Sequence, residues 1–182
     1  MKTLFLDTEF TELSQAAELL SIALVDENNR WFYAVFSDTK SENLSSWHQE
    51  NIVPFISLTD VQLQRLPSTG TYLQANKQQI ISSLLDWLSA YRELEVWADV
   101  PAYDWVLFSE LFGGARQLPK QIHYIVRDLA TYFTIFDIDP DTDRFEIAYQ
   151  GNPPPEIIRH NALGDAMTTK AIYEKLIIRN KQ

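Results

Sequence analysis

Near the N-terminus the sequence reads Lys2-Thr3-Leu4-Phe5-Leu6-Asp7-Thr8-Glu9-Phe10. Residues 2–6 form a short, largely apolar run, which is typical of a buried β-strand. The run leads directly into two carboxylates, Asp7 and Glu9. Because side chains at i and i+2 of a strand point to the same face, both carboxylates are expected to project into one site.

Two further apolar segments, 19–25 and 31–36, are also predicted to be strands. The polar residues 26–30 between them predict a hairpin loop. Strands joined by connections this short are expected to be antiparallel neighbours.

Helical and strand patterns alternate after these three strands. Apolar residues recur at helical spacing over 76–91, and 95–98 is predicted to be a strand that is parallel because a helix leads into it. The next helix is predicted over 99–112, with Asp99 as its N-cap and Gly113-Gly114 at its end. The remaining expected elements are a capped helix over 46–52, a short strand over 122–126, a helix ending near 136, an irregular acidic segment over 136–149 and a last helix over 161–178.

This order predicts one α/β domain over residues 1–182. Its sheet is expected to be mixed, with three antiparallel strands followed by parallel strands, and helices are expected to flank both faces.

Composition narrows the possible functions. Fifteen Lys and Arg stand against 25 Asp and Glu, a formal net charge of −10, which argues against a protein that binds duplex nucleic acid through a basic surface. A metal-dependent nuclease is compatible with this charge, because its carboxylates hold the cations that face the substrate.

The sequence lacks cysteine, which excludes a disulfide scaffold and a thiolate metal site. It contains no apolar run long enough to span a bilayer, and an acid at position 7 argues against a signal peptide. We therefore expect a cytoplasmic protein without a membrane partner.

Two later segments carry further candidate catalytic residues. Asp104 lies between Tyr103 and Trp105, shortly after the predicted strand 95–98, and Asp165 lies five residues after His160. Residues five apart on a helix diverge by about 140°, so His160 and Asp165 can serve one site only if His160 precedes the last helix. Asn161 is a favourable N-cap and predicts that boundary. A histidine beside metal-binding carboxylates is well placed as a general base.

Each of these elements, taken alone, also has an ordinary structural explanation. Asp7 and Glu9 could be a helix-capping acid and a solvated neighbour. Asp104 could be an acid in the first turn of a helix, where the helix dipole favours it. His160 could be an isolated surface histidine. The set is more specific than its parts, because Asp7 and Glu9 form the only D-x-E in the sequence.

Together, Asp7-x-Glu9, Asp104 after an aromatic residue, and His160-x-x-x-x-Asp165 resemble the DEDDh group of 3′→5′ exonucleases, which have the ribonuclease H-like fold. The motif segments are most similar to a small bacterial and phage exoribonuclease branch known from mycobacteria. The resemblance covers nearly the whole chain. Asn161 stands where the tyrosine variant of the family has tyrosine, so the histidine form is the match. The sequence departs from the family where relatives often have Asn, since Val100 and Pro101 occupy that region.

The resemblance implies a metal-dependent 3′→5′ exoribonuclease that releases nucleoside 5′-monophosphates. It implies that His160 is the general base and that two Mg²⁺ or Mn²⁺ ions are held by Asp7, Glu9, Asp104 and Asp165. The expected partner is single-stranded RNA or an RNA 3′ overhang, and a homodimer is plausible from relatives. Substrate contacts are expected from Thr8, Glu9, Phe10, Tyr103, Trp105 and His160, although Phe10 and one of the two flanking aromatics are also suited to the core. The alternatives are a 3′→5′ exodeoxyribonuclease and a non-catalytic nucleic-acid-binding protein of the same fold.

Overall fold

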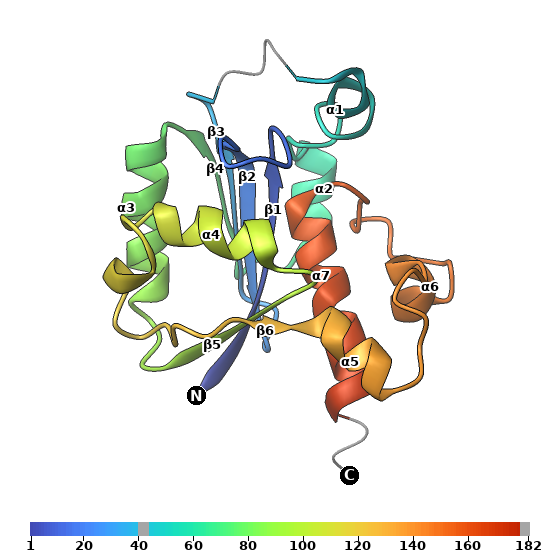
Figure 1. Ribbon diagram of the computed structural model, residues 1–182. Helices are drawn as coiled ribbons and strands as arrows, with labels where there is room; N and C mark the ends of the chain where they lie inside the picture. The colour runs from blue at the N-terminus through green and yellow to red at the C-terminus, as the bar shows by residue number, and fades with distance from the viewer. Residues whose placement is uncertain (40–43, 179–182) are drawn as a thin grey trace.

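A six-stranded sheet with the strand order β4-β3-β2-β1-β5-β6 forms the centre of the fold in the computed structural model, which describes residues 1–39 and 44–178 (Figure 1). The strands are β1 (Lys2–Phe10), β2 (Leu19–Asp26), β3 (Trp31–Phe36), β4 (Thr71–Ala75), β5 (Leu94–Ala98) and β6 (Arg127–Asp128). Strands β1, β2 and β3 pair antiparallel, whereas the β3–β4, β1–β5 and β5–β6 pairs are parallel. The predicted mixed sheet is confirmed.

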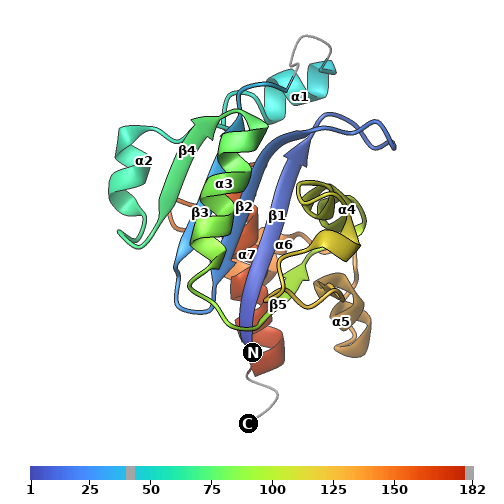
Figure 2. The same ribbon diagram turned by 90° about the vertical axis from the view of Figure 1, so that its left-hand side faces the viewer.

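Helices cover both faces of the sheet. Helix α3 (Lys77–Leu88) contacts β3 and β4, and α7 (Ala162–Tyr173) contacts β1, β2 and β3. Figure 2 shows the sheet between these two helices. Because β2 is central and covered on both sides, all of its residues are buried.

Alternation along β1 decides where its carboxylates point. Leu4 and Leu6 belong to the core cluster that includes α3, whereas Phe5 belongs to the cluster that includes α7. Asp7 and Glu9 share the face of Phe5 because a strand has a period of two. Both carboxylates therefore lie on the α7 side of the sheet.

The remaining helical elements are shorter than the two that cover the sheet. They are α1 (Ser46–Asn51), α2 (Asp60–Arg65), α4 (Ala102–Glu110), the 3₁₀ turn η1 (Ala115–Gln117), α5 (Leu129–Ile135), α6 (Arg144–Tyr149) and the π-helical η2 (Glu174–Ile178). No helix in the described ranges is long and apolar enough to cross a membrane.

Several predicted boundaries differ from the structure. Strand β4 and helix α2 were not predicted, and α6 lies within the segment expected to be irregular. Ile122 forms only an isolated bridge with Leu94, and the strand expected there begins at Arg127 instead. Helix α1 is capped by Ser45 rather than Ser46, because the Ser45 side chain accepts the N–H of His48.

Candidate active site

Three carboxylates converge where the second half of β1 meets the first turn of α7. Asp7 and Glu9 come from β1, and Asp165 comes from α7. One oxygen atom from each of the three lies within 4.8 Å of the others. The sheet alternation and the helix start thus bring together residues from the two ends of the sequence.

Asp104 joins these acids from the first turn of α4. Its Oδ1 accepts hydrogen bonds from the Thr8 backbone N–H at 2.9 Å and from the Thr8 hydroxyl at 2.7 Å. The structure places Asp104 outside the tight three-carboxylate group but close enough to raise the pKa values of Asp7 and Glu9. The predicted contact of Thr8 with substrate stays a prediction, and in the structure Thr8 orients the Asp104 carboxylate.

His160 precedes α7, as predicted. Asn161 is the N-cap, and its side-chain oxygen accepts the N–H groups of Leu163 and Gly164. His160 has a positive φ of 57°, a conformation uncommon for a residue with a side chain. Its backbone N–H donates to Asp165 Oδ2 at 2.9 Å. This turn fixes the histidine next to the carboxylate that it is expected to assist.

Further contacts hold this turn in place. The Asn161 side-chain nitrogen donates to Tyr33 Oη at 3.0 Å and to the Phe55 carbonyl at 2.7 Å. A β-carbon on Gly164 would lie 2.2 Å from the Ile158 carbonyl oxygen. The close approach of two backbone segments therefore requires glycine directly before Asp165.

The acids are crowded and withdrawn from water, and their pKa values show it. Burial, followed by repulsion from Asp104, Asp165 and Glu9, raises the pKa of Asp7 well above its usual range. Burial, followed by repulsion from Asp165 and Asp104, raises the pKa of Glu9 to about 8. Burial also raises the pKa of Asp165 to about 7, although the His160 N–H lowers it in part.

The pKa values of two other groups at the site are also shifted, mainly by burial. Burial raises the pKa of Asp104 to about 6, against the hydrogen bonds from Thr8, which lower it. Burial and the nearby Arg159 lower the pKa of His160 from its ordinary value, which favours the neutral imidazole that can accept a proton.

This donor set fits hard divalent cations. Carboxylate oxygens are the ligands that Mg²⁺ and Mn²⁺ prefer, and clustered acids with raised pKa values are relieved when a cation binds between them. The described residues provide such oxygens from Asp7, Glu9 and Asp165, with Asp104 adjacent.

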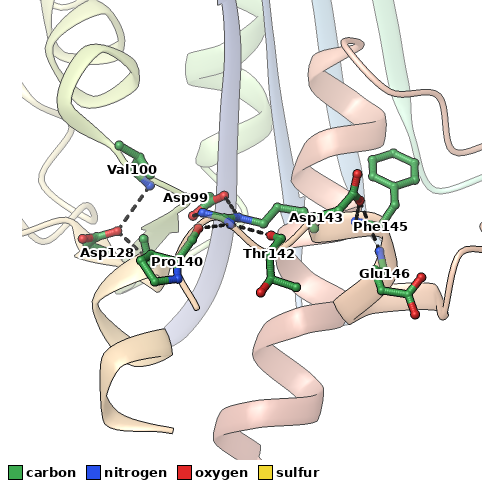
Figure 3. A network of polar contacts seen from close by, with 10 residues as sticks. Asp99, Val100, Asp128, Pro140, Thr142, Asp143, Phe145 and Glu146 are labelled. Atoms are coloured by element: carbon green, nitrogen blue, oxygen red, sulfur yellow. Dashed lines mark hydrogen bonds and ion pairs between the residues drawn. The ribbon is translucent and has the colours of Figure 1, made fainter. Parts of the chain in front are cut away.

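Asp99 does not cap α4, so that prediction is wrong. The helix begins at Ala102, and no side chain caps it. Val100 has a positive φ of 51°, which turns the chain between β5 and α4, and the carboxylate of Asp99 pairs with Arg144 at 2.6 Å (Figure 3). Asp99 and Arg144 line a cavity of about 240 Å³ together with Asp7, His160 and Asp165.

From the sequence, Asp99 competes with Asp104 as a site residue because it directly follows the apolar strand β5, but it was assigned to the helix cap. Arg144 was not predicted to belong to the site, because it lies in a segment interpreted as a hydrated acidic loop.

Several of the predicted contact residues near the acids are aromatic. The rings of Phe10 and Tyr103 stack with centroids 5.4 Å apart, and Trp105 packs beside Phe108 and against the α3-side core. Trp47 of α1 was not predicted to belong to the site. Its ring lies edge-on to the His160 ring, with the two ring centroids 5.2 Å apart. The Trp47 residue is 49% exposed.

Comparison with solved structures shows which known proteins share this fold. The nuclease domain of 3′hExo, a DEDDh family member bound to rAMP, matches with a TM-score of 0.62 at 13% identity over 98% of this chain and 92% of that one. A full-length 3′-exonuclease matches with a TM-score of 0.61 at 12% identity, over 98% and 82% of the two chains. The chain therefore has the ribonuclease H-like fold that these nuclease structures share.

Sequence comparison gives the family. The model of the 3′-5′ exoribonuclease Rv2179c-like domain matches residues 2–177. The 3′-5′ exoribonuclease Rv2179c of Mycobacterium tuberculosis is 33% identical over 127 residues, which cover 69% of this chain and 70% of the relative. The chain belongs to the Rv2179c-like 3′→5′ exoribonuclease family, and the predicted enzyme class and activity are confirmed.

Proposed function

We propose that Asp7, Glu9, Asp104 and Asp165 hold two Mg²⁺ or Mn²⁺ ions and that His160 is the general base for hydrolysis at RNA 3′ ends. The observation that carries this proposal is the convergence of three carboxylate oxygens within 4.8 Å, beside a histidine fixed by a hydrogen bond to Asp165. When bound, such a pair of cations stabilises the charge on the attacking and leaving oxygens of a phosphodiester.

The residues of this chain then have separate roles. His160 takes a proton from water, and the water oxygen forms a bond to the last internucleotide phosphorus. The bond from that phosphorus to the 3′ oxygen of the preceding nucleotide breaks, and that oxygen leaves with a proton from solvent. The products are a nucleoside 5′-monophosphate and an RNA shorter by one residue. The Asp165 carboxylate accepts a hydrogen bond from the His160 backbone N–H, which keeps the proposed base next to the proposed metal ligand.

We further propose single-stranded RNA or an RNA 3′ overhang as substrate. A neighbour of the same fold is described by its recognition of a histone mRNA stem-loop at the 3′ end. Phe10 and Tyr103 are suited to contact the terminal base, since aromatic rings stack on bases at about 1–3 kcal/mol each. The predicted contact of Trp105 stays a prediction, and its packing against the core favours a structural role.

Three other expectations also stay predictions. A single exonuclease domain is supported by the one sheet that both core clusters share. The homodimer is expected from the resemblance to the family, and the cytoplasmic location is expected from the sequence.

Digestion of 5′-labelled RNA and DNA of one sequence, with Mg²⁺, Mn²⁺ or EDTA, tests the proposed function. We expect a ladder that shortens from the 3′ end, requires metal and advances faster on RNA, whose 2′-OH distinguishes it from DNA. A circular RNA of the same sequence is the matched control and should stay intact, because it has no 3′ end. Intact linear RNA with both metals, together with retained RNA binding, would instead support a non-catalytic binding protein.

A further inference from the structure

Asp99 lies beside Asp7 at the active site, directly after the neighbouring parallel strand β5. Phe5 pairs with Trp97 at the end of the β1–β5 register, and Asp7 and Asp99 each follow two positions further along the chain. Both line the cavity that also contains His160 and Asp165. A fifth carboxylate thus adjoins the four that the metal proposal uses.

Arg144 holds this fifth carboxylate in a fixed geometry. Its Nε donates to Asp99 Oδ2 at 2.6 Å and its Nη2 to Oδ1 at 3.3 Å. Its Nη1 donates to the carbonyls of Pro140 at 2.6 Å and Thr142 at 2.8 Å, and the guanidinium lies 4.5 Å from the centre of the Phe133 ring. Figure 3 shows Asp99 beside the two carbonyl-bearing residues in this network.

The pair is also shielded from water. The side chains of Arg144 and Asp99 are only 24% and 18% exposed, so their charges act across a medium less polarisable than bulk water. Such a two-pronged contact between guanidinium and carboxylate fixes direction as well as distance. The two hydrogen bonds from Arg144 therefore fix the orientation of the Asp99 carboxylate.

The negative charge of Asp99 affects the charge balance of the proposed metal site. Four carboxylates match the four positive charges of two divalent cations, whereas an uncompensated fifth carboxylate would leave the site with an extra negative charge. Asp99 is close enough to raise the pKa values of Asp7, Asp104 and Asp165. The charge of Asp99 therefore interacts electrostatically with the proposed metal ligands.

We propose that Arg144 and Asp99 form a positioning pair in which Arg144 keeps Asp99 out of the metal ligand set and thereby sets the cation affinity of the four neighbouring carboxylates. The inference rests on the proposed metal site. It predicts opposite effects from removing the two partners, because Arg144→Gln removes a positive charge and Asp99→Asn removes a negative one.

Calorimetric titration of Mn²⁺ into metal-free protein, without RNA, tests the pair. Arg144→Gln should tighten Mn²⁺ binding and Asp99→Asn should weaken it, each roughly three- to tenfold as expected for one nearby charge. The double variant should return to within about twofold of wild type. Arg92→Gln is the matched control, since it makes the same charge change at the opposite end of β5, and should leave the affinity unchanged.

Each other outcome has a definite meaning. If both single variants weaken Mn²⁺ binding, or if the double variant fails to restore it, the pair only supports the fold and the inference is overturned. If Arg144→Gln does not fold, Arg144→Lys keeps the charge and should bind Mn²⁺ nearly as wild type does, while Asp99→Asn alone must still bind more weakly. If wild type binds no Mn²⁺, the proposed metal site itself fails.

Discussion

Thr8 and Asp104, 96 residues apart in the sequence, are joined by two hydrogen bonds to a single carboxylate oxygen. The donors are the backbone N–H and the hydroxyl of Thr8, and both are buried with their acceptor. Hydrogen bonds to the charged form of a carboxyl favour ionisation. Thr8, which lies between two proposed metal ligands on β1, thus keeps a third ligand on α4 available to a cation.

Substituting Thr8 tests this role. Thr8→Val preserves shape but removes the hydroxyl donor, so the pKa of Asp104 should rise further. The free energy of unfolding should fall by about 1–3 kcal/mol in urea at pH 7.5, because a buried charged acceptor loses a partner. Thr8→Ser retains the donor and is the control; equal losses in the two variants would show that the hydroxyl does not matter.

Replacing His160 should separate catalysis from metal binding. His160→Asn should reduce kcat on RNA by about 10²–10⁴-fold, the usual contribution of a general base. The fold should persist, since Asn tolerates the positive φ at this position, and Mn²⁺ affinity by calorimetry should change little. His123→Asn, away from the acids, should keep full activity. An unchanged kcat in His160→Asn would assign the base to another group.

The stability of the metal-free protein should depend on pH in a defined direction. Asp7, Glu9, Asp104 and Asp165 have raised pKa values in the folded state, so between about pH 4 and pH 8 the folded state binds more protons than the unfolded chain. The Tm should therefore decrease as pH rises through this window.

Added Mn²⁺ should counteract that decrease. Metal binds the deprotonated carboxylates and displaces their protons, so the Tm increase caused by Mn²⁺ should be larger at pH 8 than at pH 5. Differential scanning fluorimetry across this range measures both effects. A Tm increase independent of pH would place the bound Mn²⁺ elsewhere.

Gly164 should not tolerate a side chain. The new β-carbon of Gly164→Ala would meet the Ile158 carbonyl oxygen and amide nitrogen at 2.2 and 2.8 Å, and backbone atoms cannot move aside as a side chain can. We expect a loss of about 1–3 kcal/mol in the free energy of unfolding from overpacking, with reduced activity because Asp165 shifts. Ala171→Gly, at a half-buried position of α7, is the control for helix propensity and should cost about 1 kcal/mol.

Local patterns in the sequence predicted most of the fold. The apolar runs of β1, β2 and β3 and the 3–4 spacing of α3 are properties of contiguous residues, and all four elements formed close to their expected bounds. Strand β4 was missed because it is an edge strand whose residues are mostly half-buried, so its pattern is weak. Helix α6 was missed because the alternating acids before it resemble a loop, although Asp143 in fact caps it.

The sequence likewise predicted some residues of the candidate site and not others. Asp7, Glu9, Asp104, His160 and Asp165 follow motifs that the sequence displays, and the position of His160 before α7 follows from helix geometry and the Asn161 cap. The Asp99–Arg144 pair depends on a strained turn at Val100 and on a contact 45 residues distant. Trp47 meets His160 only through packing of α1. Neither contact leaves a periodic signal in the sequence.

Anomalous diffraction from crystals of the protein grown with Mn²⁺ and a nucleoside 5′-monophosphate tests the central claim most directly. We predict two anomalous peaks about 3.5–4 Å apart, bounded by Asp7, Glu9, Asp104 and Asp165, with the His160 imidazole facing the phosphate, and loss of at least one peak in Asp165→Asn. Peaks that lie away from these four carboxylates, or two peaks that persist unchanged in Asp165→Asn, would contradict the account.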